Sequence, residues 1–131
     1  MNLFRKKYSI FTKKFMNINL KVYQQKAVDQ LTDSVKHLLE RPGIGEICVF
    51  QAPTGSGKTV VTAKFIESLI RELPDVDLCF VWMSIGKGDL QLQSKHSLER
   101  IFGGSPRVTL VEEEFGGSRE RIVRNEVVVA N

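Results

Sequence analysis

The chain has few residues of the kinds that cross-link or anchor a protein. Its 131 residues include two cysteines and two histidines, and neither type forms a cluster that suggests a disulfide framework or a metal site. We expect Cys48 and Cys79 to be small core residues inside buried strands, and His37 and His96 to lie on the surfaces of helices. No apolar stretch is long enough to cross a bilayer. The composition therefore indicates one soluble globular domain.

Acidic residues are absent from the first 28 positions, which hold seven basic side chains, whereas the remaining positions hold twelve basic and fifteen acidic ones. The net charge of +4 therefore belongs to the N-terminal arm. Such an arm, residues 1–17, could contact a nucleic-acid backbone, or it could be a disordered or solvated leader. Met16 is also an alternative start, which would make residues 1–15 an extension without a role. Basic residues interrupt the apolar positions between Phe4 and Phe15, so the arm lacks a signal-peptide core. We expect a cytoplasmic protein.

Apolar periodicity predicts alternating helices and strands after this arm. Apolar residues at helical spacing, followed by Pro or Gly residues that end the helix, favour three helices. Short apolar runs favour four strands. The expected helices are 22–40, 59–73 and 90–102, with one or two further helical turns at 119–124; the expected strands are 47–50, 77–82, 108–111 and 127–130. This alternation predicts an α/β domain with a parallel sheet and right-handed crossovers.

A glycine-rich turn stands between the first expected strand and the second expected helix. Residues 52–59 read Ala-Pro-Thr-Gly-Ser-Gly-Lys-Thr. Gly55 and Gly57 let the backbone approach a phosphate closely, and successive N–H groups then form an anion-binding nest. Lys58 would bring its ammonium to the β- and γ-phosphates, and the Thr59 hydroxyl would ligate Mg²⁺. The order of strand, glycine turn and helix predicts a nucleotide phosphate loop.

The loop and the segment before it resemble superfamily 2 helicases. Ala52 stands where the loop usually begins with glycine. This alanine form of the loop is familiar in superfamily 1 and 2 helicases. Upstream, Leu20-Lys21-x-Tyr23-Gln24 looks like the adenine-reading segment of superfamily 2. The resemblance implies that Gln24 contacts the adenine Hoogsteen edge, which an amide matches with one donor and one acceptor, and that Tyr23 stacks or packs beside it.

A third segment resembles a narrower family. The pattern Trp82-x-Ser84…Leu90-x-x-Gln93-Ser94 is similar to the restriction (Res) subunit of type III restriction–modification enzymes and to related DEAD/DEAH-like helicases. The resemblance implies contacts with nucleic-acid phosphates from this segment. Its candidate contact residues are Ser84, Gly86, Lys87 and Gln93. A polar loop with a helix cap is the alternative interpretation.

The resemblance covers residues 18–131 and implies a partial RecA-like P-loop NTPase domain that ends before the family's Asp-Glu box. It implies ATP and Mg²⁺ as cofactors, DNA as a partner through the full-length protein, and a modification (methyltransferase) subunit, with no membrane. Lys58 and Thr59 would be the catalytic residues. The cofactor-binding set would be Tyr23, Gln24, Pro53, Thr54, Gly55, Ser56, Gly57, Lys58 and Thr59. The parent would be an ATP hydrolase, with any nuclease site elsewhere, and the chain alone is expected to be inactive.

Other interpretations remain open from the sequence. Glu112 and Glu113 could be mistaken for the Asp-Glu pair, but their short spacing from Thr59 favours a solvated loop. A stand-alone nucleotide-binding regulatory module would use the same phosphate loop without catalysis. Another phosphate-loop enzyme, such as a small-molecule kinase, is disfavoured because no Arg-rich lid segment follows.

Overall fold

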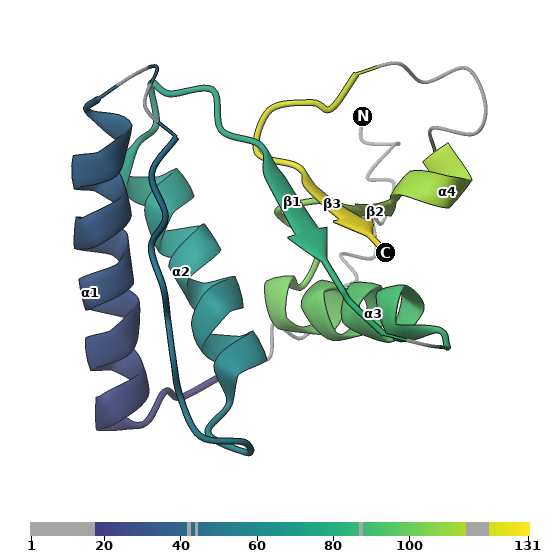
Figure 1. Ribbon diagram of the computed structural model, residues 1–131, viewed down its shortest axis with the longest axis horizontal. Helices are drawn as coiled ribbons and strands as arrows, with labels where there is room; N and C mark the ends of the chain where they lie inside the picture. Colours follow the sequence, from purple (N-terminus) through teal and green to yellow (C-terminus); the bar gives the residue numbers. More distant parts are fainter. Residues whose placement is uncertain (1–17, 42, 44, 87, 115–120) are drawn as a thin grey trace, which may run out of the picture.

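The computed structural model describes residues 18–41, 43, 45–86, 88–114 and 121–131. These residues form four helices and three strands (Figure 1). The elements are α1 (Val22–Leu39), α2 (Lys58–Glu72), β1 (Phe80–Met83), α3 (Leu90–Phe102), β2 (Val108–Leu110), α4 (Val111–Glu114) and β3 (Val127–Ala130). The predicted α/β class is confirmed: the domain is a small parallel sheet flanked by helices, as in part of a RecA-like fold.

The strand that comes last in the sequence lies in the centre of the sheet. The strand order is β1-β3-β2, and both pairs are parallel. Val127 is opposite Phe80 on one side and Val108 on the other. The β3 sequence is a run of β-branched valines, which suits a strand buried on both faces. Accordingly, Val127 has no solvent exposure.

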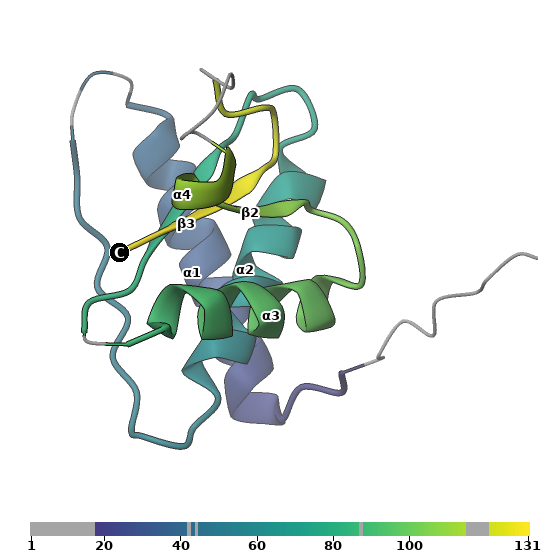
Figure 2. The ribbon, with the colours of Figure 1, turned by 90° about the vertical axis from the view of Figure 1, so that its right-hand side faces the viewer.

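The core is built where α2 and α3 meet this sheet. Leu98 of α3 is fully buried and belongs to the same apolar cluster as Ala63 of α2 and Val129 of β3. Figure 2 shows α3 running across the direction of α1 and α2, below the strands. The predicted helix 90–102 is confirmed at both ends. It ends before Gly103, which adopts the left-handed conformation with which helices commonly terminate.

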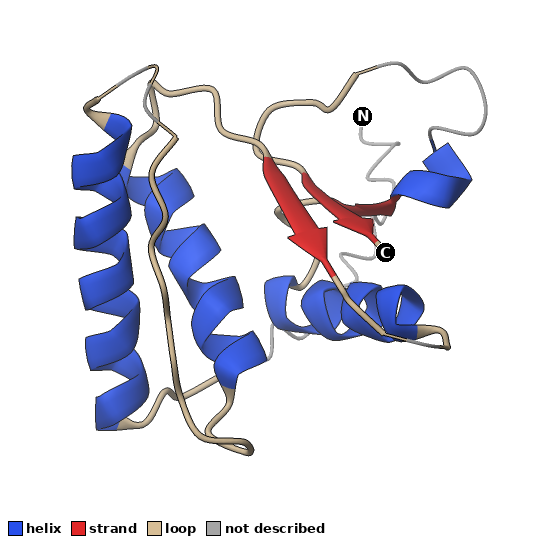
Figure 3. Cartoon of the chain, viewed as in Figure 1, coloured by secondary structure: helices blue, strands red, loops and turns tan. Residues whose placement is uncertain are grey.

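Helices α1 and α2 lie side by side and form a second layer next to the sheet (Figure 3). Val28 of α1 and Leu69 of α2 are buried. At the C-terminal ends of the two helices, Lys36 Nζ lies 2.7 Å from Glu72 Oε2. The hydrogen bond to Glu72 raises the pKa of Lys36, and the same bond lowers the pKa of Glu72. In the part of the chain that the structure describes, no helix has the length and apolar content for a bilayer crossing.

The predicted buried strand at 47–50 is wrong. These residues form no strand, and the exposed fractions of Ile47 and Val49 are 88% and 81%. The segment runs alongside the helix pair, apart from the sheet (Figure 1). An apolar run becomes a strand only where a neighbouring strand takes up its backbone N–H and C=O groups, and the described sheet offers none here.

The expected burial of both cysteines is also wrong. Cys48 lies in the exposed segment just described, and Cys79 immediately precedes β1 and is exposed as well. The strand predicted at 77–82 begins three residues later than expected, at Phe80, so Cys79 falls outside it. Leu78 is buried there instead. Both thiols are free.

Smaller corrections concern the segment around α4. The strand predicted at 108–111 ends at Leu110, and Val111 begins the short helix α4 where a polar loop was expected. Of the helical turns predicted at 119–124, residues 121–124 are not helical, and 119–120 lie outside the described residues. The buried carboxylate of Glu126 accepts hydrogen bonds from Thr109 Oγ1 and from the Val123 N–H, and thereby ties the turn before β3 to β2. The N-terminal arm, residues 1–17, also lies outside the described residues.

Candidate functional site

The glycine turn predicted to hold phosphate is present and leads directly into α2. Gly55 and Gly57 have φ angles of +79° and +84°, a region that glycine enters without the steric cost of a Cβ. The Ser56 N–H donates to the Pro53 carbonyl at 3.2 Å and closes the turn. In Figure 1 the turn lies toward the bottom of the picture, the end to which the strand arrows point. The turn therefore lies at the N-terminal end of α2, but the strand expected to lead into it is absent, so the turn does not follow a strand of the described sheet.

The side chain of Lys58 folds back over this turn. Its ammonium donates to the Ala52 carbonyl at 2.8 Å and to the Pro53 carbonyl at 3.1 Å. The side chain stays exposed, so an anion can reach the ammonium from solvent. Since Lys58 is also the first residue of α2, its charge adds to the partial positive charge of the helix N-terminus. The turn thus combines two sources of attraction for an anion.

Thr59 and the surrounding groups fit a nucleotide-bound Mg²⁺ better than a protein-held metal. Thr59 is exposed in the first turn of α2, where its hydroxyl can complete the shell of a cation carried by phosphates. Among the described residues, no group of three or more His, Cys, Asp or Glu side chains could hold a metal ion. Glu112 and Glu113 are exposed on α4, away from the turn. Phosphate oxygens and water would supply the remaining ligands.

The first turn of α1 contacts the glycine turn through one backbone carbonyl. The Tyr23 hydroxyl donates to the Ser56 carbonyl at 3.1 Å, and Gln24 Nε2 donates to the same oxygen at 3.0 Å. Gln24 Oε1 accepts from the Lys21 N–H at 2.9 Å. The structure therefore brings Tyr23 and Gln24 to the glycine turn. The adenine contact assigned to Gln24, with Tyr23 beside it, stays a prediction.

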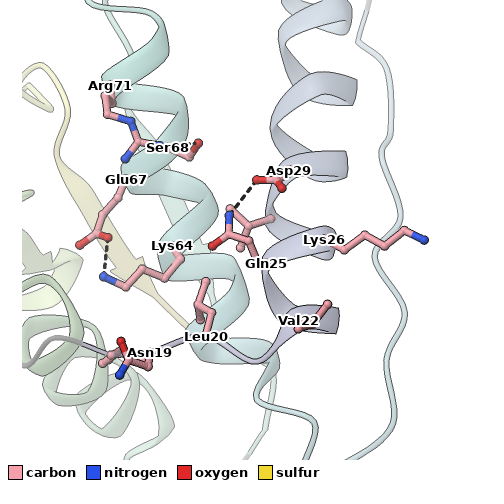
Figure 4. Close-up of a pocket in the computed structure, with 12 residues that line it drawn as sticks. Asn19, Leu20, Val22, Gln25, Lys26, Asp29, Lys64, Glu67, Ser68 and Arg71 are labelled. Carbon is pink, nitrogen blue, oxygen red and sulfur yellow. Dashed lines mark hydrogen bonds and ion pairs between the residues drawn. The ribbon is translucent and has the colours of Figure 1, made fainter.

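Two hollows lie beside α1. A cavity of about 800 Å³ lies between the start of α1 and the outer face of α2 (Figure 4). Around its rim, Lys64 pairs with Glu67 at 2.7 Å and Gln25 donates to Asp29 at 2.8 Å, while Lys26 and Arg71 add two further positive charges. A second cavity of about 430 Å³ lies between α1 and residues 48–53, and Tyr23 and Ser56 line it. The second hollow adjoins the glycine turn, whereas no residue of the turn lines the first.

The predicted nucleic-acid contacts lie after the carboxyl end of β1. The Ser84 N–H donates to the Ala130 carbonyl at 3.0 Å, and its hydroxyl lies 3.0 Å from the Ser94 hydroxyl. Gly86 and Gln93 are exposed, the latter in the first turn of α3. Lys87 lies outside the described residues. The segment therefore presents polar groups after the carboxyl end of β1, and their contact with nucleic acid stays a prediction.

Two positioning contacts of this site were missed from the sequence. The Ser94 hydroxyl orients Ser84, and the Gln-Ser pair at 93–94 was a signal that could have revealed it. The Ser56 carbonyl, by contrast, is a backbone group, and no residue pattern distinguishes it from its neighbours. Its role emerges only from the packing of α1 against the turn.

Comparison with known families gives one finding. A family model described as the res subunit of type III restriction enzymes matches residues 17–131, which is nearly the whole chain. No curated protein and no solved structure gives a match.

Proposed function

The chain belongs to the family of type III restriction enzyme res subunits, and on that premise we propose that it is the ATP-binding portion of an ATP-dependent DNA helicase or translocase. The family supports a helicase-like motor module that uses ATP. The observation that carries the proposal is the glycine turn at 54–57, with Gly55 and Gly57 at positive φ and Lys58 at the start of α2.

Each part of the turn has a role in this proposal. The backbone amides of Thr54, Gly55 and Gly57 line the triphosphate, and the Ser56 N–H closes the turn by donating to the Pro53 carbonyl. Lys58 exchanges its two carbonyl partners for phosphate oxygens, which are charged and therefore stronger acceptors. Thr59 ligates the Mg²⁺ that accompanies the nucleotide. Bound ATP supplies a phosphoanhydride bond whose hydrolysis drives movement in the intact motor.

DNA is the polymer on which the intact motor would act. Ser84, Gly86 and Gln93 are the proposed phosphate contacts, together with Lys87 on the sequence argument. Phosphate contacts position a protein without reading sequence, so this segment would follow any DNA strand. In the family context, a modification (methyltransferase) subunit is the proposed protein partner.

The test is calorimetric titration of the chain with ATP–Mg²⁺. Lys58→Ala removes the charge-assisted bonds to the phosphates and is expected to weaken binding about ten- to a hundredfold. Lys36→Ala is the matched control, because it removes the same charge near the C-terminal end of α1, where Lys36 pairs with Glu72. The glycine turn contacts the other end of that helix. Equal affinities of Lys58→Ala and the unaltered chain would refute the assignment of the turn to phosphate.

A further inference from the structure

We propose that Tyr23 and Gln24 form a clamp on the Ser56 carbonyl that fixes the phosphate loop, so that Gln24 governs affinity for any triphosphate and not for adenine alone. The Tyr23 hydroxyl and Gln24 Nε2 are the two donors of this clamp. The inference rests on the proposed phosphate-binding function and changes the role of Gln24 within it. In this role Gln24 is a positioning residue, because it acts on the ligand through the loop.

The hydrogen bonds of Gln24 carry the argument. Reading the Hoogsteen edge of adenine requires the amide oxygen and nitrogen to face one base together. Here the oxygen faces the Lys21 N–H at 2.9 Å and the nitrogen faces the Ser56 carbonyl at 3.0 Å. The two ends of the amide thus join the start of α1 to the glycine turn. To read a base, Gln24 would have to release at least one of these backbone groups.

The close packing of Gly57 against this amide supports the clamp independently. A Cβ built on Gly57 would lie 2.5 Å from Gln24 Nε2, well inside contact distance. Glycine suits this position because of its φ of +84°, and any side chain here would also have to displace the end of the Gln24 amide from the Ser56 carbonyl.

The clamp has a direct consequence for ligand binding. The turn is held within itself by the Ser56 N–H bond to Pro53, and the clamp attaches it to α1 through the carbonyl of the same residue. A loop that is already ordered loses less conformational entropy when a ligand binds. Loss of the clamp would therefore weaken every ligand that the loop holds by its phosphates, whatever base is attached.

Three ligands and three variants test this proposal. ATP, GTP and inorganic tripolyphosphate, each with Mg²⁺, are titrated against Gln24→Ala, Tyr23→Phe and Gln25→Ala. We expect Gln24→Ala to weaken all three ligands by a similar factor of roughly two to ten, and Tyr23→Phe to do the same more weakly. Gln25→Ala is the control and should change nothing, because that neighbouring amide bonds Asp29 and not the loop. A loss confined to ATP would overturn the clamp and restore the adenine contact.

Amide hydrogen exchange tests the clamp without any ligand. The Ser56 N–H is hydrogen-bonded in the turn, so its exchange reports whether the turn opens. Gln24→Glu retains an acceptor for the Lys21 N–H but loses the donor to Ser56, which separates the helix cap from the loop contact. Faster exchange at Ser56 in Gln24→Glu, with unchanged exchange in α3, is the expected result. Unchanged exchange at Ser56 would overturn the clamp even if nucleotide binds. If the unaltered chain binds none of the three ligands, the proposed function fails, and the exchange result still decides the clamp.

Discussion

The central strand and the segment that leads to the glycine turn have similar sequences and opposite environments. Val127-Val128-Val129 lies between two strands, packs against α3 and is almost completely buried. Ile47-Cys48-Val49 is just as apolar, yet all three residues are exposed beside the helix pair. The difference lies in the neighbours, because a strand is stable only where adjoining strands pair with its backbone. Hydrophobicity along a chain therefore predicts a tendency to form a strand, and the surrounding structure decides whether it is realised.

The largest expected effect tests the buried side of this comparison. Leu98→Ala removes a fully buried side chain from the cluster that packs against β3. Because the surrounding structure relaxes only in part, the free energy of unfolding should fall by about 3–5 kcal/mol, measured by urea denaturation. Leu92→Ala, on the more exposed side of the same helix, is the control and should cost far less. Similar losses for the two variants would mean that α3 does not anchor the core.

A smaller effect comes from making one substitution in both environments. Val129→Thr places a hydroxyl in the buried sheet and should lower the free energy of unfolding by about 1–3 kcal/mol. Val49→Thr adds the same hydroxyl in a side chain that is 81% exposed, and should change stability by less than about 0.5 kcal/mol. Thermal denaturation of both proteins measures the contrast. A large loss from Val49→Thr would show that this segment is packed in solution.

The smallest expected effect concerns the ion pair that joins the two helices. The bond from Lys36 lowers the pKa of Glu72, so the contribution of this carboxylate is full above its ordinary pKa and is lost as the pH falls through the lowered value. The raised pKa of Lys36 gives a contribution that is full below its ordinary pKa and is lost as the pH rises through the raised value. Solvent screens both groups, so the effect is small.

A variant series across pH measures this ion pair. Lys36→Met should lower the melting temperature slightly at neutral pH, and the difference should vanish in strong acid, where Glu72 is protonated. Lys26→Met on the same helix is the control, because Lys26 makes no ion pair among the described residues. A difference that persists unchanged in acid would show that the Lys36 stem contributes by packing, without the charge.

The elements that could be predicted from the sequence are those whose signals are local. Helix α3 follows from its apolar spacing and from the glycines at 103–104 that end it, and the glycine turn follows from residues 55 and 57. The segment 47–50 could not be placed, because its burial depends on strands elsewhere in space. The link from α1 to the turn could not be predicted either, since its acceptor is the backbone oxygen of Ser56.

The two exposed thiols give this chain a practical property. Cys48 lies on the segment that leads to the glycine turn, and Cys79 immediately precedes β1; these are the only cysteines in the sequence. A pair of spin labels or fluorophores can therefore be attached to the unmutated chain, one on the exposed segment before the glycine turn and one next to the sheet. The spacing between such labels would follow any rearrangement of the loop relative to the sheet when nucleotide is added.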